Sequence, residues 1–193
     1  MSQGYREFSR ETERLVIRAW TLEDASDAFE MYGDPRVVEY LTGTTEESVE
    51  TQRDVLRRII HSYSNLHIVL GSFPIVDKST GSLVGAVLLK PLPRNEDLDA
   101  WRAFRDDPST VPPIHEIEVG WHLKHAHWGK GYATEAAREM LRYAFEDAGL
   151  KEVYAIVYPQ NTASIAVTRR LNMRPLGPTD RFYGVQAELF VTP

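Results

Sequence analysis

The chain of 193 residues contains no cysteine, no long apolar run and no excess of positive charge. The lack of cysteine excludes a disulfide framework, a thiolate metal site and a cysteine acyl-enzyme intermediate. No apolar run approaches the roughly 18 residues of a membrane helix, and the N-terminal segment MSQGYREFSRETER lacks the apolar centre of a secretion signal. We therefore expect a cytoplasmic protein with no membrane partner.

Acidic residues outnumber basic ones by 28 to 22, which gives a formal net charge of −6. This balance argues against nucleic acid as a partner, because phosphate binding requires a basic face. With 42% apolar and 26% charged residues, the composition is typical of a globular protein with a full core. We find no internal repeat, low-complexity tract or linker, so we expect a single domain over residues 1–193.

Hydrophobic periodicity predicts a mixed α/β fold. The expected elements, in chain order, are a strand at 12–20, a helix at 22–32, a helix after Thr44 or Thr45, a hairpin of 66–77 and 81–89, a strand at 115–123, a helix at 131–149, a strand at 151–159, a helix at 161–173 and a strand at 181–191. Residues 90–113 are rich in proline and charge, and we interpret them as a long surface insertion with a short helix. Such a segment is either a lid over a site or a tolerated excursion.

The most informative stretch is EIEVGWHLKHAHWGKGYATEA, residues 116–136, where a strand leads through a glycine-bearing loop into a helix. Gly129 and Gly131 allow the backbone to approach a ligand closely, and the first N–H groups of a helix have no intrahelical acceptor. These donors favour a phosphate or diphosphate, with Lys130 adding charge; otherwise the glycines only permit a tight turn. A P-loop is absent because no Gly-Lys-Ser or Gly-Lys-Thr occurs, and a dinucleotide fingerprint lacks its third glycine at Thr134.

The segment HWGKGYATEA resembles the acyl-CoA pyrophosphate signature of the Gcn5-related N-acetyltransferases, Q/R-x-x-G-x-G/A, with Gly131 and Ala133 at the small-residue positions. Trp128 replaces the usual Gln or Arg, and this form is similar to the subgroup of ribosomal-protein alanine N-acetyltransferases, the RimJ/RimL-like proteins. The segments TERLVIRAW, DPRVVEYL, GSLVGAVLL and N161-x-x-S164 resemble that subgroup in the same order, so the resemblance covers about residues 12 to 190.

The resemblance implies a mostly antiparallel central sheet of about seven strands flanked by about four helices. In this fold the sheet is splayed between strands 115–123 and 151–158, and acyl-CoA lies in the opening. It further implies acetyl transfer from acetyl-CoA to a primary amine of a peptide N-terminus or a small molecule, without a metal. Transfer of another acyl group and a non-catalytic acyl-CoA sensor stay open, and an exposed C-terminal hairpin is compatible with a homodimer. The residues expected to hold acetyl-CoA are Trp121, His122, Leu123, Trp128, Gly129, Lys130, Gly131, Tyr132, Ala133, Thr134, Asn161 and Ser164.

The strand at 115–123 offers the groups for chemistry. Alternation places Glu116, Glu118, Gly120 and His122 on one face and apolar residues on the other. Acyl transfer to an amine requires a base, and Glu118 is our first choice, at the position where the resemblance places a glutamate of related enzymes. His122 is the alternative base, and a merely salt-bridged Glu118 is the structural alternative.

Asn161, Ser164 and Thr168 form a polar stripe on the last helix, which either faces pantetheine or caps the helix and meets solvent. Many related enzymes carry a tyrosine where this chain has Thr168, so the resemblance leaves Ser164, or a water that it holds, as the candidate proton donor to the thiolate. The spacing of His122, His125 and His127 is like that of metal ligands, but strand alternation gives their side chains no common direction, so we expect no metal.

Overall fold

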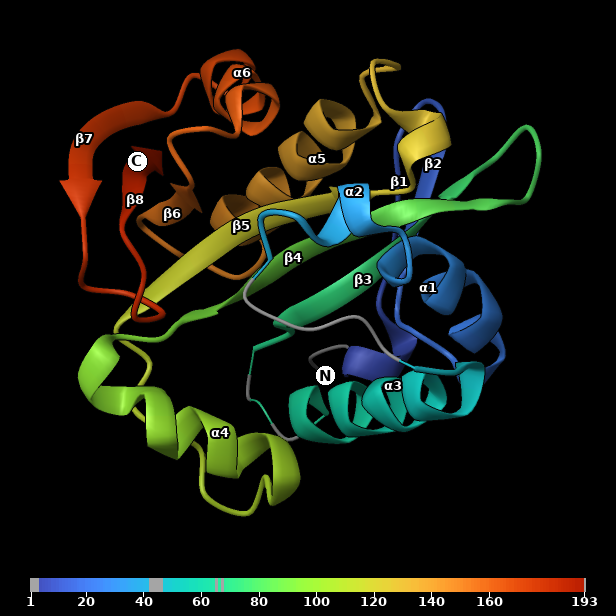
Figure 1. Cartoon of the computed structure of the whole chain (residues 1–193), viewed down its shortest axis with the longest axis horizontal. Helices are drawn as coiled ribbons and strands as arrows, with labels where there is room; N and C mark the ends of the chain where they lie inside the picture. The colour runs from blue at the N-terminus through green and yellow to red at the C-terminus, as the bar shows by residue number, and fades with distance from the viewer. Residues whose placement is uncertain (1–3, 42–46, 65, 67, 193) are drawn as a thin grey trace.

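The computed structural model describes residues 4–41, 47–64, 66 and 68–192. Its strands form one open sheet in the order β1-β2-β3-β4-β5-β6-β8-β7, which Figure 1 shows running across the molecule. The strands are β1 (Ser9–Glu11), β2 (Leu15–Arg18), β3 (Gly71–Asp77), β4 (Leu83–Leu92), β5 (Glu116–Leu123), β6 (Val153–Val157), β7 (Arg174–Thr179) and β8 (Ala187–Thr192). Among the strands of the described residues, only β5 and β6 pair in parallel. The mixed, mostly antiparallel fold is thus confirmed, with 8 strands where about seven were expected.

The α-helices of the described residues are α1 (Ala25–Tyr32), α2 (Pro35–Val38), α3 (Val49–Tyr63), α4 (Leu98–Asp106), α5 (Tyr132–Glu146) and α6 (Thr162–Arg170). Short 3-10 helices lie at Tyr5–Glu7, Leu22–Asp24, Asn95–Asp97 and His125–His127. No helix in the described part of the chain is long and apolar enough to cross a membrane. The single domain over 1–193 and the cytoplasmic location stay predictions.

The predicted boundaries need correction at both ends of the chain. The strand expected at 12–20 is shorter, because only Leu15–Arg18 form β2. Residues 12–14 form a turn in which the Thr12 N–H donates to the Leu15 carbonyl (2.9 Å), and the preceding strand β1 was not predicted. At the other end, β7 follows α6 and only residues 187–192 form the last strand. The strand β7 escaped prediction because Pro175 and Pro178 interrupt it and its side chains are mostly exposed, as an edge strand permits.

Two internal boundaries also differ from expectation. The helix expected after Thr44 or Thr45 begins at Val49, and Ser48 caps it by accepting a hydrogen bond from the Thr51 N–H at 3.1 Å. Thr44 and Thr45 themselves lie outside the described residues. Strand β4 continues through Leu92, so the first residues of the expected insertion at 90–113 belong to the sheet; the short helix predicted there is α4.

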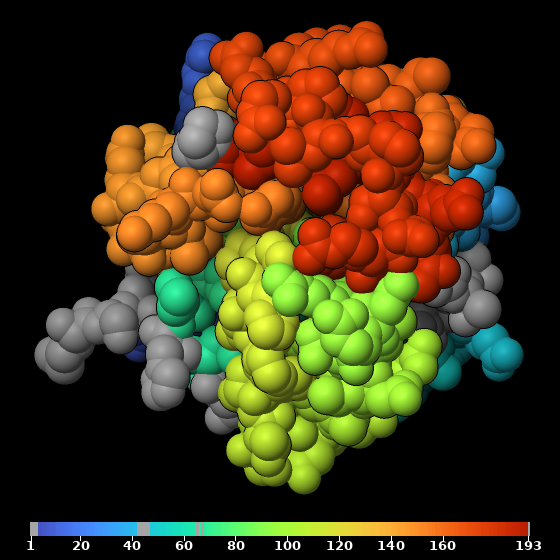
Figure 2. Space-filling view, turned by 90° about the vertical axis from the view of Figure 1, so that its left-hand side faces the viewer, coloured from blue at the N-terminus to red at the C-terminus, as the bar shows by residue number. Residues whose placement is uncertain are grey.

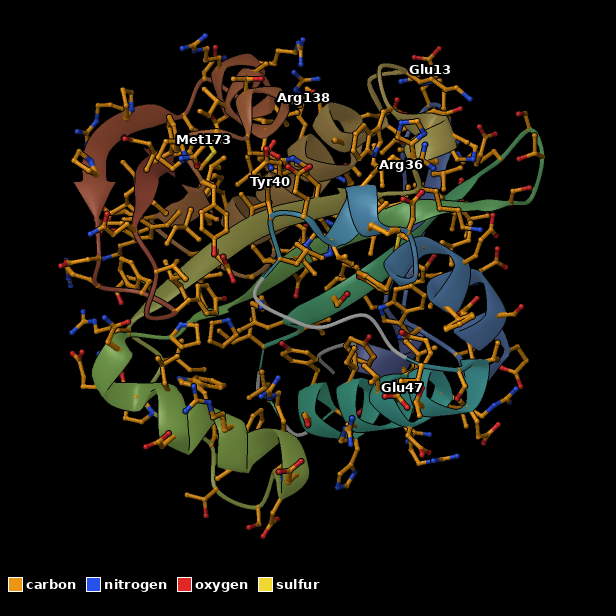
Figure 3. All side chains as sticks on the ribbon, viewed as in Figure 1. Glu13, Arg36, Tyr40, Glu47, Arg138 and Met173 are labelled. Carbon is orange, nitrogen blue, oxygen red and sulfur yellow. The ribbon has the colours of Figure 1, made fainter. Side chains whose placement is uncertain are left out.

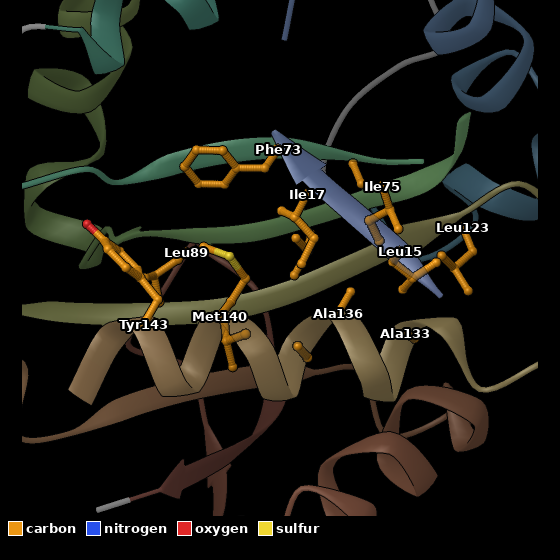
Figure 4. Packing of buried hydrophobic residues seen from close by; sticks show 14 of the residues in the cluster. Leu15, Ile17, Phe73, Ile75, Leu89, Leu123, Ala133, Ala136, Met140 and Tyr143 are labelled. Atoms are coloured by element: carbon orange, nitrogen blue, oxygen red, sulfur yellow. The ribbon is translucent and has the colours of Figure 1, made fainter. Parts of the chain in front are cut away.

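The core lies between the sheet and α5, as Figure 4 shows. The small side chains of Ala133 and Ala136 let the helix approach the strands, and Met140 and Tyr143 fill the space farther along it. The strand residues that the helix covers in this view are Leu15, Ile17, Phe73, Ile75, Leu89 and Leu123. Helices α1 and α3 lie on the opposite face, so this sheet is covered on both sides.

The sheet opens between β5 and β6. Their ladder contains the single pair Glu118 and Tyr154, whereas β4 pairs with β5 along its whole length, from Leu92 opposite Glu116 to Gly85 opposite Leu123. Beyond Glu118 the second edge of β5 is therefore not paired with β6. This is the splay that the resemblance implied, and it produces an opening in the middle of the sheet.

Candidate active site

The opening between β5 and β6 leads into a cavity of about 1170 Å³. Segments far apart in the sequence form its wall. In Figure 3, Arg36 and Tyr40 lie on and after α2, in front of the sheet, whereas Arg138 lies on α5. The ring of Tyr40 is 6.1 Å from that of Tyr158, just after β6, so the segment after α2 reaches across the opening.

The N-terminus of α5 borders this cavity. Gly129 and Gly131 have φ angles of +75° and +82°, a left-handed conformation that glycine adopts without the clash of a Cβ atom. The Glu135 N–H donates to the Gly131 carbonyl (3.1 Å), but no side chain caps this helix, and all these residues are described. The N–H groups of Tyr132, Ala133 and Thr134 therefore have no intrahelical acceptor. The loop has the backbone geometry of an anion site.

Glu135 anchors this loop to the turn between β1 and β2. Its carboxylate accepts hydrogen bonds from the Thr12 hydroxyl (2.5 Å) and from Arg14 Nε (2.7 Å), while Arg14 Nη1 donates to the Lys130 carbonyl (3.0 Å). Burial of Glu135 opposes its ionisation, but these hydrogen bonds lower its pKa, so it stays charged. The anchored carboxylate holds the glycine loop in place from the cavity wall, which Glu135 and Arg14 also line.

Most of the predicted acetyl-CoA residues lie on the cavity wall, but Lys130 and Tyr132 do not. The Lys130 side chain is exposed, and the Tyr132 hydroxyl donates to the Asp77 carboxylate on the far side of the loop. Hydrogen bonds from Ser79 and Tyr132 lower the pKa of Asp77 to about 2. The predicted site residues that line the cavity are Glu118, Trp121, His122, Leu123, Trp128, Gly129, Gly131, Ala133, Thr134, Asn161 and Ser164.

The two faces of β5 are arranged as alternation predicts. Ile117, Val119 and Leu123 are buried in the core, and the half-buried Trp121 on the same face donates from Nε1 to the Ser164 hydroxyl at 3.3 Å. Glu118 lies on the other face and is only 5% exposed. The strand thus presents a carboxylate to the cavity and fixes Ser164 of α6 through an indole ring.

Glu118 belongs to a polar triad with Lys90 and Tyr183, in which Glu118 is buried and the other two residues are half-buried. Lys90 lies directly opposite Glu118 in the β4–β5 ladder, with its Nζ 3.4 Å from Glu118 Oε1, and the Tyr183 hydroxyl donates to the same oxygen. Burial opposes the charge on Lys90, but the neighbouring Tyr183 and Glu118 raise its pKa. Burial and the Glu118 carboxylate raise the pKa of Tyr183. The triad therefore consists of an ammonium, a carboxylate and a neutral phenol.

His122 lies beside this triad as a neutral imidazole. Burial and the charge of Lys90 lower its pKa to about 4, and its Nδ1 is 3.1 Å from the Tyr32 hydroxyl. The other two histidines of the suspected metal spacing point elsewhere, since His125 packs on Trp128 and His127 on Tyr132. Within the described ranges, no group of three His, Asp or Glu residues is arranged to hold a metal ion.

Of the polar stripe predicted on α6, Asn161 and Ser164 face the cavity but Thr168 does not. Asn161 caps the helix by accepting a hydrogen bond from the Ser164 N–H at 3.0 Å, and both residues line the cavity. Thr168 is fully buried, and its hydroxyl donates to the Ile165 carbonyl (2.8 Å) within the helix. The prediction for Thr168 is wrong because a threonine hydroxyl in a helix can bond back to its own backbone instead of facing a ligand.

Sequence reasoning missed Lys90, Tyr183 and Tyr32. Lys90 was assigned to the insertion, although its position at the end of the apolar run LVGAVLL could have placed it on a strand. Tyr32 was assigned to the apolar face of its helix. Tyr183 gave no local signal, because it lies in an irregular segment between β7 and β8.

The splayed sheet, the uncapped helix N-terminus at its opening and the buried carboxylate match the arrangement that the resemblance implied, that of an acyl-CoA-dependent N-acyltransferase. The family model described as an acetyltransferase (GNAT) domain matches residues 14–174, so the chain belongs to the GNAT acetyltransferase family. It is an N-acetyltransferase, and this family uses acetyl-CoA.

Individual relatives agree with this assignment. The uncharacterized N-acetyltransferase p20 of Bacillus licheniformis is 30% identical over 166 residues, which cover 86% of this chain and 82% of that protein. A GNAT-family acetyltransferase from Bacillus anthracis has the same fold, with a TM-score of 0.71 at 22% identity, covering 96% of this chain and 98% of that one. The ribosomal-protein-S5-alanine acetyltransferase from Vibrio fischeri has a TM-score of 0.71 at 18% identity and covers 96% of each chain.

Proposed function

We propose that this enzyme acetylates a primary amine of a peptide N-terminus or a small molecule, with Glu118 as the base and Ser164 as the proton donor to the leaving thiolate. One observation carries the proposal: the uncapped N-terminus of α5 and the buried carboxylate of Glu118 lie on the wall of the same cavity. A diphosphate and a reacting amine can therefore be bound in the same open cavity.

Acetyl-CoA is held in this proposal by main-chain donors. The N–H groups from Gly129 to Thr134 receive the diphosphate at the positive end of α5. The pantetheine arm then pairs with the edge of β5 at Trp121–Leu123 that β6 leaves open, as an added strand would. Asn161 and Ser164 border its path on the α6 side.

The chemistry uses groups already placed at this opening. Glu118 takes a proton from the acceptor ammonium, and the free amine attacks the thioester carbonyl carbon. The new C–N bond forms and the C–S bond breaks. The thiolate takes a proton from the Ser164 hydroxyl or from a water that it holds, and the extra proton left on the new amide nitrogen replaces the one that was given up. His122 stays the alternative base, since its pKa of about 4 leaves the imidazole neutral near pH 7.

Two features support an amine as the acceptor. The net charge of −6 favours the approach of a cation. The Vibrio fischeri relative is named for acetylation of an alanine of ribosomal protein S5, which supports including a peptide N-terminus among the candidate acceptors.

The test follows release of CoA with a thiol reagent over a panel of amines, and the absence of cysteine removes the protein's own background. Glu118→Gln is expected to lower kcat/KM at least about tenfold while acetyl-CoA still binds, because only the base is lost. Glu116→Gln is the matched control: Glu116 lies on the same strand face, paired with Arg94 at 2.6 Å, and does not line the cavity.

The two variants separate the possible outcomes. Wild-type activity of Glu118→Gln would remove Glu118 as the base, and an equal loss of activity in Glu116→Gln would show that the effect is not specific to the carboxylate in the cavity. Binding of acetyl-CoA without turnover of any amine would indicate a sensor instead of an enzyme.

A further inference from the structure

We infer that Tyr183 and Lys90 are positioning residues, which together fix Oε1 of Glu118 so that Oε2 is the atom that takes the proton of the acceptor amine. The inference rests on the proposed role of Glu118 and adds which oxygen acts and what orients it. Neither residue is assigned a part in proton transfer.

The contacts of Glu118 are unevenly divided between its two oxygens. The Tyr183 hydroxyl and the Lys90 ammonium both meet Oε1, whereas Oε2 has no hydrogen bond from any residue that the structure describes. Lys90 Nζ also lies 5.3 Å from the centre of the Tyr183 ring, so each member of the triad contacts the other two. A carboxylate with one oxygen held in this way offers the other to a ligand in the cavity that Glu118 lines.

The protonation states of the two partners suit a holding role. The raised pKa of Tyr183 keeps its hydroxyl a hydrogen-bond donor, and the raised pKa of Lys90 keeps its side chain an ammonium. Neither group gives up its proton near neutral pH. Both therefore stabilise the ionised carboxylate and leave the proton exchange to Glu118 and the acceptor.

The loop that carries Tyr183 is itself fixed. Tyr183 has a φ angle of +56°, a left-handed conformation that a residue with a side chain adopts only when its surroundings impose it. The surroundings here come from Asn95: its N–H donates to the Arg181 carbonyl (2.9 Å), its Nδ2 to the Asp180 carbonyl (2.6 Å), and its Oδ1 accepts from the Gly184 N–H (2.8 Å).

Figure 2 shows the result on the surface, where the red atoms of the C-terminal segment rest directly on the green atoms of the segment before α4. Residues 93–97, at the start of the expected insertion, thus act as a brace for the loop that holds Tyr183. This gives that part of the insertion a role in shaping the site, whether or not the remainder moves as a lid.

The test uses Tyr183→Phe, which removes the hydroxyl and keeps the ring. We expect kcat to fall about tenfold with the Kd for acetyl-CoA unchanged within about twofold. The acid limb of the kcat/KM profile should move to higher pH, because the carboxylate loses a donor that stabilises its charged form. A role limited to folding would not move this limb.

Tyr154→Phe is the matched control. The Tyr154 hydroxyl donates to Glu152 at 2.8 Å, and Tyr154 does not line the cavity, so its loss should leave both kcat and the pH profile unchanged. Lys90→Gln provides a second variant that does not depend on the stability of the Tyr183 loop, and it should move the acid limb in the same direction.

Combining the variants separates this inference from the proposed function. In the Glu118→Gln background, Tyr183→Phe should lower the residual kcat by less than about twofold, because its effect passes through Glu118. A wild-type kcat and pH profile for Tyr183→Phe, or a full additional loss in the Glu118→Gln background, would overturn the inference while Glu118 stays the base. An active Glu118→Gln enzyme would instead refute the proposed function itself.

Discussion

Gly131→Ala should lower both the stability of the protein and its affinity for acetyl-CoA, because position 131 requires a left-handed backbone conformation. At its φ angle of +82°, a side-chain-bearing residue is disfavoured by about 1–2 kcal/mol. Each kcal/mol lowers the melting temperature of a domain of this size by about 2–4 °C. The added Cβ would lie 3.4 Å from Arg14 Nη2, which is an ordinary van der Waals contact, so steric repulsion adds little. We therefore expect the melting temperature to fall by about 2–8 °C.

The effect on binding should be larger than the effect on stability. Arg14 also donates to the Lys130 carbonyl, so displacement of its guanidinium, or a change of φ at position 131, turns the donors of the loop away from their common direction. A hydrogen bond to a charged group contributes about 1.5–3 kcal/mol. Loss of one such bond to the diphosphate weakens acetyl-CoA binding by about tenfold to one-hundredfold.

Gly149→Ala is the control, because Gly149 follows the other end of α5 with a φ angle of +69° and no atom within 4 Å of an added Cβ. In thermal denaturation the melting temperatures of the two variants should fall by similar amounts. In calorimetry with acetyl-CoA, only Gly131→Ala should show weaker binding. If both variants bind acetyl-CoA as tightly as the wild type, the N-terminus of α5 is not the diphosphate site.

Two further predictions concern buried charge. Asp24→Asn should destabilise the fold by about 2–3 kcal/mol in denaturant titrations. The Asp24 carboxylate is only 7% exposed and accepts hydrogen bonds from both terminal nitrogens of Arg18, at 2.7 and 2.8 Å. Asp54→Asn is the control and should change stability far less, because Asp54 pairs with Arg57 on the exposed surface. The His122 ring should stay neutral in NMR titrations down to about pH 5, because its pKa is about 4. In the unfolded chain the His122 ring binds a proton below about pH 6.5, whereas in the folded chain it does so only near pH 4. The free energy of unfolding should therefore fall as the pH is lowered from about 6.5 to about 4, and His122→Gln should make this fall less steep. A protonated His122 at pH 6 would contradict its burial.

Local patterns in the sequence determined much of this protein. The alternation of β5 separated Glu118 from its buried neighbours Ile117 and Val119, and the apolar stripe of α5 predicted the helix that covers the sheet. The glycines at 129 and 131 predicted a loop with free main-chain donors. Each of these features depends on residues within a few positions of one another, where backbone geometry alone dictates which face a side chain occupies.

Only the tertiary structure decided what surrounds Glu118. Lys90 meets it through the register of β4 on β5, and Tyr183 meets it across 65 residues of chain because Asn95 holds the intervening loop. In the same way, Tyr32 is turned to His122 by packing that no local spacing encodes. The sequence by itself thus put Glu116 and Glu118 on one strand face, and only the folded chain shows which of them lines the cavity, Glu118. Its charged and hydrogen-bonded environment arises from strand register and loop contacts between distant segments, which are settled only when the whole core is packed.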